Sequence, residues 1–179
     1  MDNAFLMMLD NAPRRVFAFL SLVCLAMLGF GLYLQHSQGL EPCPMCIVQR
    51  YALLSVAILA GLFSASGRKR VHFWGSFVLL LAAGFGAFVA ARQSWLQWYP
   101  PEVATCGRDF YGMIENFPLN RAIPMIFRGS GDCAAIDWTF LGGSIANWAF
   151  VIFCLVLALA SLMIWRKRQK THSFCAASS

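Results

Sequence analysis

The chain has 179 residues, of which 59% are hydrophobic and 12% are charged, and its mean hydropathy is +0.62. This composition lies far outside the range of soluble globular domains and indicates an integral membrane protein. The formal net charge of +6 comes from cations that gather on one side of the expected membrane spans, so it gives no support to a nucleic-acid-binding function.

Four apolar runs along the chain are long enough to cross a hydrocarbon layer of about 30 Å. The expected spans are, approximately, residues 16–34, 45–65, 71–91 and 145–165. The uninterrupted apolar part of the second run is short for a span, so we expect its helix to begin near Pro44, because proline suits the first turn of a helix. The sequence therefore predicts an all-α membrane protein, with residues 1–179 forming a single domain built as a four-transmembrane-helix bundle.

The lysine and arginine residues predict the orientation of these spans, because short cytoplasmic loops retain cations. Nine of the fourteen cations lie before the first span, between the second and third spans, or after the fourth. They are Arg14, Arg15, Arg68, Lys69, Arg70, Arg166, Lys167, Arg168 and Lys170. We therefore expect both termini in the cytoplasm and two loops on the opposite side of the membrane, at about residues 35–44 and 92–143.

Four of the seven cysteines fall on the side of the membrane opposite the termini. Cys43 and Cys46 form a C-x-x-C pair where the second span begins, and Cys106 and Cys133 lie in the long loop. The other three are Cys24, Cys154 and Cys175. We interpret the first two of these as buried thiols within spans and the third as a reduced thiol in the cytoplasmic tail. The even set of four on the other side indicates disulfide chemistry there.

The C-x-x-C pair favours redox chemistry, because a bridge between Cys43 and Cys46 closes almost no loop and so stabilises little. Backbone N–H groups at a helix start favour a thiolate, and Arg50 adds a cation one turn later. We therefore expect Cys46 to donate electron density to an acceptor held at the membrane surface. Arg50 either extends to the lipid headgroups or hydrogen-bonds a carbonyl oxygen of a lipid-soluble quinone. A bridge between Cys106 and Cys133 has two possible roles. It either takes part in redox chemistry, or it is a structural disulfide that stabilises the folded protein by about 3–4 kcal/mol.

Several motifs together resemble the bacterial DsbB family of disulfide bond formation proteins. They are Cys43-Pro44-Met45-Cys46 with Arg50, Leu96-Gln97-Trp98-Tyr99-Pro100, Ala104-Thr105-Cys106, Gly131-Asp132-Cys133, and Trp138 with Phe140-Leu141-Gly142. The resemblance covers roughly residues 34–148, and the set of motifs is specific. It implies a multi-pass protein of the bacterial inner membrane, with the two outer loops in the periplasm. It further implies a protein that reoxidises the periplasmic thioredoxin-like oxidase DsbA and passes two electrons to ubiquinone or menaquinone.

The resemblance also implies an order of action for the four outer cysteines. Cys106 would form the mixed disulfide with the partner. Cys133 would then reach Cys43, which leaves Cys46 to engage the quinone, assisted by Arg50. We accordingly predict that the resting protein contains one bridge within the C-x-x-C pair and one between the two loop cysteines.

One quinone contact of the family differs in this sequence. The family often has a histidine near the outer end of the third span, where this chain has the segment Arg92-Gln93-Ser94-Trp95. If Gln93 takes the place of that histidine, it can hydrogen-bond a quinone but cannot titrate near neutral pH.

Three alternatives remain open at this point. A quinone-linked thiol oxidoreductase similar to vitamin K epoxide reductase has its loop cysteines before the C-x-x-C pair, whereas here they follow it. A DsbB paralogue that serves a dedicated partner has the same motifs. A non-enzymatic membrane scaffold would hold its four outer cysteines in structural disulfides or around a metal ion, although their spacing differs from that of zinc knuckles.

Overall fold

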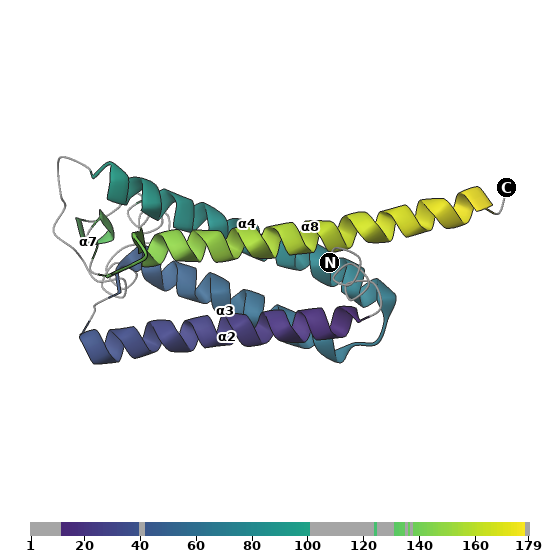
Figure 1. Ribbon diagram of the computed structural model, residues 1–179, viewed down its shortest axis with the longest axis horizontal. Helices are drawn as coiled ribbons and strands as arrows, with labels where there is room; N and C mark the ends of the chain where they lie inside the picture. The colour runs from purple at the N-terminus through teal and green to yellow at the C-terminus, as the bar shows by residue number, and fades with distance from the viewer. Residues whose placement is uncertain are drawn as a thin grey trace.

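Four long helices make up most of the described chain (Figure 1). The computed structural model describes residues 12–39, 42–100, 124, 131–134, 136 and 138–177. Its elements, in chain order, are α2 (Pro13–Gln38), α3 (Pro44–Ala65), α4 (Lys69–Trp98), α7 (Gly131–Ala134), β1 (Thr139–Phe140), β2 (Gly143–Ser144) and α8 (Ile145–Ala177). Helices α2, α3, α4 and α8 are long and apolar enough to cross a membrane, which confirms the expected all-α fold with four spanning helices.

Each expected span lies inside one of these helices, but α2, α4 and α8 run further than the apolar residues do. Helix α2 continues to Gln38 and α4 to Trp98, so the first residues of both expected outer loops are helical. A helix satisfies its own backbone hydrogen bonds, so polar side chains do not end it where the apolar layer ends. Gly39, in the left-handed conformation with φ of 64°, caps α2, and Pro100 follows the end of α4. Helix α3 begins at Pro44, as expected.

The helices form a bundle in which α2 packs on α3, α3 on α4, and α4 on α8. Helix α2 starts at one end of the bundle, and α8 extends past the same end (Figure 1). The start of α3, α7 and the two strands lie at the other end, called the cysteine end from here on. The distribution of cations remains the basis for expecting the cysteine end to face away from the cytoplasm.

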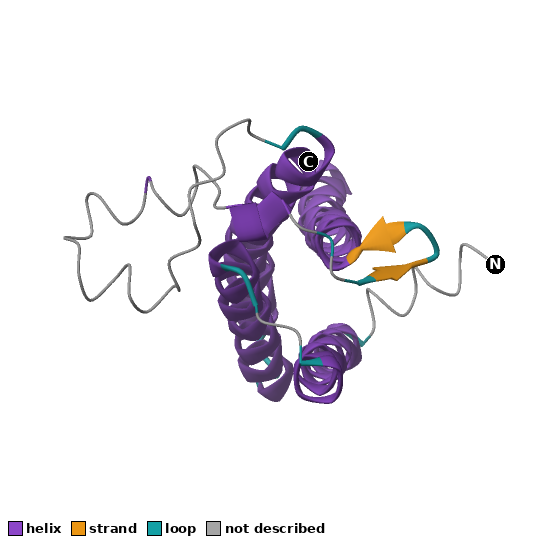
Figure 2. Cartoon of the chain, turned by 90° about the vertical axis from the view of Figure 1, so that its left-hand side faces the viewer, coloured by secondary structure: helices purple, strands orange, loops and turns teal. Residues whose placement is uncertain are grey.

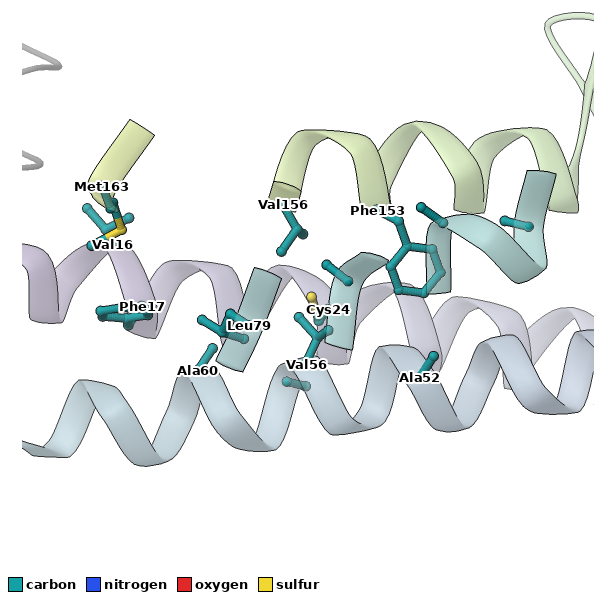
Figure 3. Close-up of a cluster of buried hydrophobic side chains, with 14 residues drawn as sticks. Val16, Phe17, Cys24, Ala52, Val56, Ala60, Leu79, Phe153, Val156 and Met163 are labelled. Atoms are coloured by element: carbon teal, nitrogen blue, oxygen red, sulfur yellow. The ribbon is translucent and has the colours of Figure 1, made fainter. Parts of the chain in front are cut away.

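Small residues allow the helices to approach closely in the core. A Cβ atom at Gly86 of α4 would overlap the ring of Phe153 on α8, so this glycine sets the spacing of the two helices. Figure 3 shows the cluster of buried side chains that the four helices share. Cys24 is fully buried in this cluster, as predicted, whereas Cys154 on α8 is only half-buried.

A short β-hairpin lies at the cysteine end, immediately before α8 (Figure 2). Its strands β1 and β2 pair antiparallel, with Phe140 opposite Gly143. The two turn residues, Leu141 and Gly142, have φ values of 50° and 79°. Positive φ at both central residues matches the two-residue turn whose twist suits a hairpin, although leucine is an unfavourable residue there.

The hairpin is fastened to the first turn of α8. The indole Nε1 of Trp148 donates to the carbonyl oxygen of Phe140 at 2.9 Å. Gly143 lies directly under the same indole, where a Cβ would come within 2.9 Å of Nε1. Ser144 caps α8 by accepting the backbone N–H of Asn147 at 3.3 Å, and its hydroxyl also donates to Gln97 of α4 at 2.6 Å. These contacts hold the hairpin against the bundle.

Candidate active site

The C-x-x-C pair lies on the first turn of α3. Cys43 is the N-cap residue, with an extended backbone, and Pro44 occupies the first helical position. The backbone N–H of Cys46 donates to the sulfur of Cys43 at 3.2 Å. This N–H group at the start of the helix therefore contacts the sulfur of Cys43.

Cys133 of α7 joins this pair, although it lies about 90 positions further along the chain. It is fully buried and belongs to the same cluster as Cys43, Met45, Val89 and Leu96. The side chains of Cys43 and Cys133 are hydrogen-bonded, and this contact raises the pKa of the Cys43 thiol, with smaller contributions from Cys46 and from burial. Cys43 thus contacts the side chains of both Cys133 and Cys46.

The predicted disulfides remain predictions. Cys43 and Cys46 are thiols in the structure and are not bonded to each other. Cys106 lies outside the described residues, as do its predicted contacts with the partner and with Cys133. Peptide mapping after alkylation of the purified resting protein will test both predicted bridges.

Gln93 of α4 contacts the two sulfurs of the C-x-x-C pair. Its amide Nε2 donates to the sulfur of Cys46 at 3.1 Å and to that of Cys43 at 3.3 Å. Its Oε1 accepts from Nε2 of Gln49, which lies on α3. Both glutamines are buried, with 3% and 6% of their surface exposed. Sequence reasoning selected Gln93 but missed Gln49, although an uncharged polar residue in an otherwise apolar span was a signal that could have indicated it.

Arg50 turns toward the end of α2. Its Nη1 donates to Oε1 of Gln35, and the side chain is half-buried. Arg50 and Gln35 both line the cavity described next, a position that favours a role in the site over an extension to the lipid headgroups. Gln35 was not selected from the sequence, because it falls in the segment that was expected to be a loop.

A cavity of about 530 Å³ opens beside the cysteines at the same end of the bundle. Both Cys43 and Cys46 line it, together with polar side chains from three helices and β2 and apolar side chains from α2, α3 and α8. The polar side chains are Gln35, Gln49, Arg50, Gln93, Gln97 and Ser144, and the aromatic ones are Phe30, Trp138, Phe140, Trp148 and Phe153. A volume of this size, with mostly apolar walls and a few polar groups at one end, is typical of a site for a small organic molecule.

Aromatic rings cover the hairpin side of the cavity. The rings of Trp138 and Phe140 are stacked, with centroids 6.1 Å apart and an interplanar angle of 8°. The edge of Phe30 on α2 meets Trp138 at 6.0 Å, and Trp148 of α8 lies 6.2 Å from Phe140. The cavity thus offers flat π surfaces near its polar end.

The described residues contain no group of three or more histidine, cysteine or acidic side chains arranged to hold a metal ion. A metal bound by all four outer cysteines would also require Cys106, which lies outside those residues.

Comparison with known proteins decides the family. A family model for the disulfide bond formation protein DsbB matches residues 13–163. The chain belongs to the DsbB family. The resemblance found in the sequence motifs is therefore confirmed, and the protein is a multi-pass membrane protein of disulfide bond formation and a disulfide oxidoreductase.

Individual relatives match over nearly their whole length. A protein from Paracidovorax citrulli is 71% identical over 171 residues, which are 94% of this chain and 97% of that protein. One from Albidiferax ferrireducens is 70% identical over 159 residues, 89% of this chain and 91% of the relative. One from Aromatoleum aromaticum is 53% identical over 160 residues, which are 88% of this chain and 95% of that protein. All three are named disulfide bond formation protein B.

Proposed function

We propose that the protein is a thiol:quinone oxidoreductase of the bacterial inner membrane, which reoxidises a DsbA-like periplasmic protein of thioredoxin fold. Its electrons pass through two cysteine pairs to a membrane quinone, either ubiquinone or menaquinone. The observation that carries this proposal is the position of Cys46, whose sulfur contacts Gln93 and whose side chain lines the cavity that also contains Arg50. The proposed active cysteines are Cys43, Cys46, Cys106 and Cys133.

The proposed relay begins with a bridge between Cys106 and Cys133. A thiolate of the partner attacks the sulfur of Cys106, the bridge breaks, and Cys133 leaves as a thiolate. The second thiol of the partner then displaces Cys106, which completes the disulfide of the partner and leaves Cys106 and Cys133 reduced. This exchange moves two electrons and two protons from the partner into the chain.

The second exchange takes place inside the chain. Cys133 attacks Cys43 of the C-x-x-C bridge, and Cys46 leaves as a thiolate. Cys106 then attacks the sulfur of Cys133, the bond between Cys133 and Cys43 breaks, and the loop bridge is restored with Cys43 released as a thiol. The hydrogen bond between the side chains of Cys43 and Cys133 supports this exchange, because it brings together the two sulfurs that must react. After it, the C-x-x-C pair is reduced and Cys46 carries the negative charge next to the cavity.

The cavity residues fit a quinone. When bound, a quinone supplies a two-electron acceptor that leaves as a quinol after taking up two protons. Arg50 and Gln35 provide polar groups for a carbonyl oxygen, and the rings of Trp138 and Phe140 provide flat apolar surfaces. The remaining walls, from the membrane-spanning parts of α2 and α8, suit an apolar tail.

Two alternatives predict different behaviour. A non-enzymatic scaffold gives no reason for a reactive C-x-x-C pair to line a cavity with a polar end. A DsbB paralogue with a dedicated partner would share the entire site, since the partner-binding cysteine lies in the long loop. Activity with different partner proteins, and not the geometry of the cavity, will separate the paralogue from a general DsbA reoxidase.

The proposal is tested by mixing the purified protein in detergent micelles with reduced DsbA-like protein and a water-soluble ubiquinone or menaquinone analogue. We expect loss of one quinone per two thiols oxidised, measured by quinone absorbance and thiol titration. A Cys46→Ser variant should lose this activity, and Cys24→Ser, a change in the core away from the cavity, should retain it. Thiol-independent quinone loss, or full activity of Cys46→Ser, would overturn the proposal.

A further inference from the structure

We propose that the amide of Gln93 holds the negative charge on the sulfur of Cys46, and that Gln49 is a positioning residue that fixes the orientation of this amide. The inference deepens the proposed function, since it assigns how the reduced C-x-x-C pair is kept reactive. It rests on three hydrogen bonds that join α3 to α4: Gln49 to Gln93, and Gln93 to each of the two sulfurs.

A carboxamide has two N–H donors at one end and an oxygen acceptor at the other. With Nε2 toward the sulfurs, Gln93 donates to both of them; with the amide turned over, its oxygen would face their lone pairs instead. Gln49 selects the first orientation, because its own Nε2 donates to Oε1 of Gln93. The donor end of Gln93 is thereby left for Cys46 and Cys43.

Burial makes this orientation matter. Both glutamines are more than nine-tenths buried in helices that span the membrane, so water does not supply a substitute donor at low cost. A hydrogen bond to a charged sulfur is stronger than one to a neutral thiol, so Gln93 favours the charged state. Without Gln49, the amide of Gln93 could rotate and lose that preference.

The surrounding groups direct the charge to Cys46. Among the described residues, Cys133 of α7 contacts Cys43, and Arg50 of α3 lines the same cavity as the two sulfurs but uses its Nη1 on Gln35. Cys43 contacts both Cys133 and Cys46, and these contacts raise the pKa of its thiol. Cys46 therefore carries the charge, with the amide of Gln93 at 3.1 Å as its donor.

Gln93 also differs from a histidine in that it does not titrate between pH 5 and 8. Its hydrogen bond to Cys46 is thus equally available across this range. A Gln93→His variant should add a pH-dependent step near neutral pH to the reactivity of Cys46, since a histidine changes charge there.

The test measures the alkylation rate of Cys46 against pH in the fully reduced, full-length protein, with mass spectrometry to separate Cys46 from Cys43. We expect Gln93→Met to raise the pH of half-maximal rate by about one unit or more, the loss expected for one hydrogen bond to a charged group. Gln49→Met should also raise the pH of half-maximal rate. Gln38→Met, at the exposed end of α2, is the matched control and should leave it unchanged.

A double-mutant cycle decides whether Gln49 acts through Gln93. If it does, adding Gln49→Met to Gln93→Met causes no further shift. If the shift of the double variant equals the sum of the two single shifts, the positioning role of Gln49 is wrong. If Gln93→Met leaves the pH of half-maximal alkylation rate unchanged, the whole inference is wrong. Should Gln93→Met fail to fold, Gln93→Glu, which keeps the shape but removes the amide donor, serves in its place. The assay uses neither quinone nor partner, so its failure is distinguishable from failure of the proposed function.

Discussion

Replacement of Arg50 by methionine should weaken the quinone site without affecting exchange with the partner. Arg50 is half-buried, lines the cavity and is oriented by its hydrogen bond to Gln35. One hydrogen bond between a charged donor and a ligand oxygen contributes about 1.5–3 kcal/mol, so its loss should raise the KM for quinone by about 10- to 150-fold. Methionine keeps the apolar volume of the side chain, so the cavity should retain its shape.

Two further variants refine this prediction. Arg50→Lys keeps the charge but loses the planar fork, so it should give an intermediate KM. Gln35→Met leaves the charge of Arg50 and removes its orienting acceptor together with one uncharged polar group of the cavity, so its effect should be smaller than that of Arg50→Met. Arg92→Met, a cation of α4 that does not line the cavity, is the control.

The assay combines steady-state quinone reduction with a single-turnover measurement of exchange between the oxidised protein and reduced partner. We expect a raised quinone KM in Arg50→Met and an exchange rate within about twofold of the wild type, because thiol exchange between the partner and the loop cysteines precedes the quinone step. A wild-type KM in Arg50→Met would mean that Arg50 only extends to the headgroups. A slowed exchange step would mean that it acts on the cysteines.

Three other outcomes are expected. A partner that lacks its own resolving cysteine should become trapped on Cys106 as a reducible complex, which should persist in Cys133→Ser and disappear in Cys106→Ser. A complex mapped by mass spectrometry to Cys133 would reverse the proposed order of the cysteines. Gly86→Leu should destabilise the bundle by about 1–3 kcal/mol through overlap with Phe153, seen as a lower unfolding temperature in detergent, and an unchanged temperature would contradict the close helix approach. Trp148→Phe should loosen the hairpin and raise the quinone KM while the unfolding temperature changes little, since it removes the donor to the hairpin carbonyl; an unaltered KM would show that the hairpin does not shape the site.

The number of spans and the start of the cysteine helix follow from local properties of the sequence. A helix in a bilayer needs about twenty apolar residues and satisfies its own backbone, so hydropathy alone predicts four spans. Pro44 after Cys43 likewise predicts a helix start, because proline suits the first turn and cannot donate a backbone hydrogen bond there. The spacing of the cysteines and their neighbouring motifs was specific enough to indicate the family.

The helix ends and the hairpin were less accessible to the same reasoning. Hydropathy reports where the apolar layer ends, and the helices end several residues later, at a left-handed glycine and before a proline. The hairpin turn uses Leu141, a residue with little preference for positive φ, so its local signal is only the glycine that follows.

The connections inside the site were decided by the tertiary structure. Whether Gln93 meets the sulfurs, Gln49 or a quinone depends on how α3 and α4 are rotated and how closely they pack, and neither property is encoded in the periodicity of an almost uniformly apolar helix. The contact of Cys133 with Cys43 depends on the path of a loop about 90 residues away in sequence. The sequence alone indicated the family and the cysteines expected to react; the packing of the bundle decided which side chains touch, because hydrogen bonds between helices require positions and directions that only a complete set of neighbours specifies.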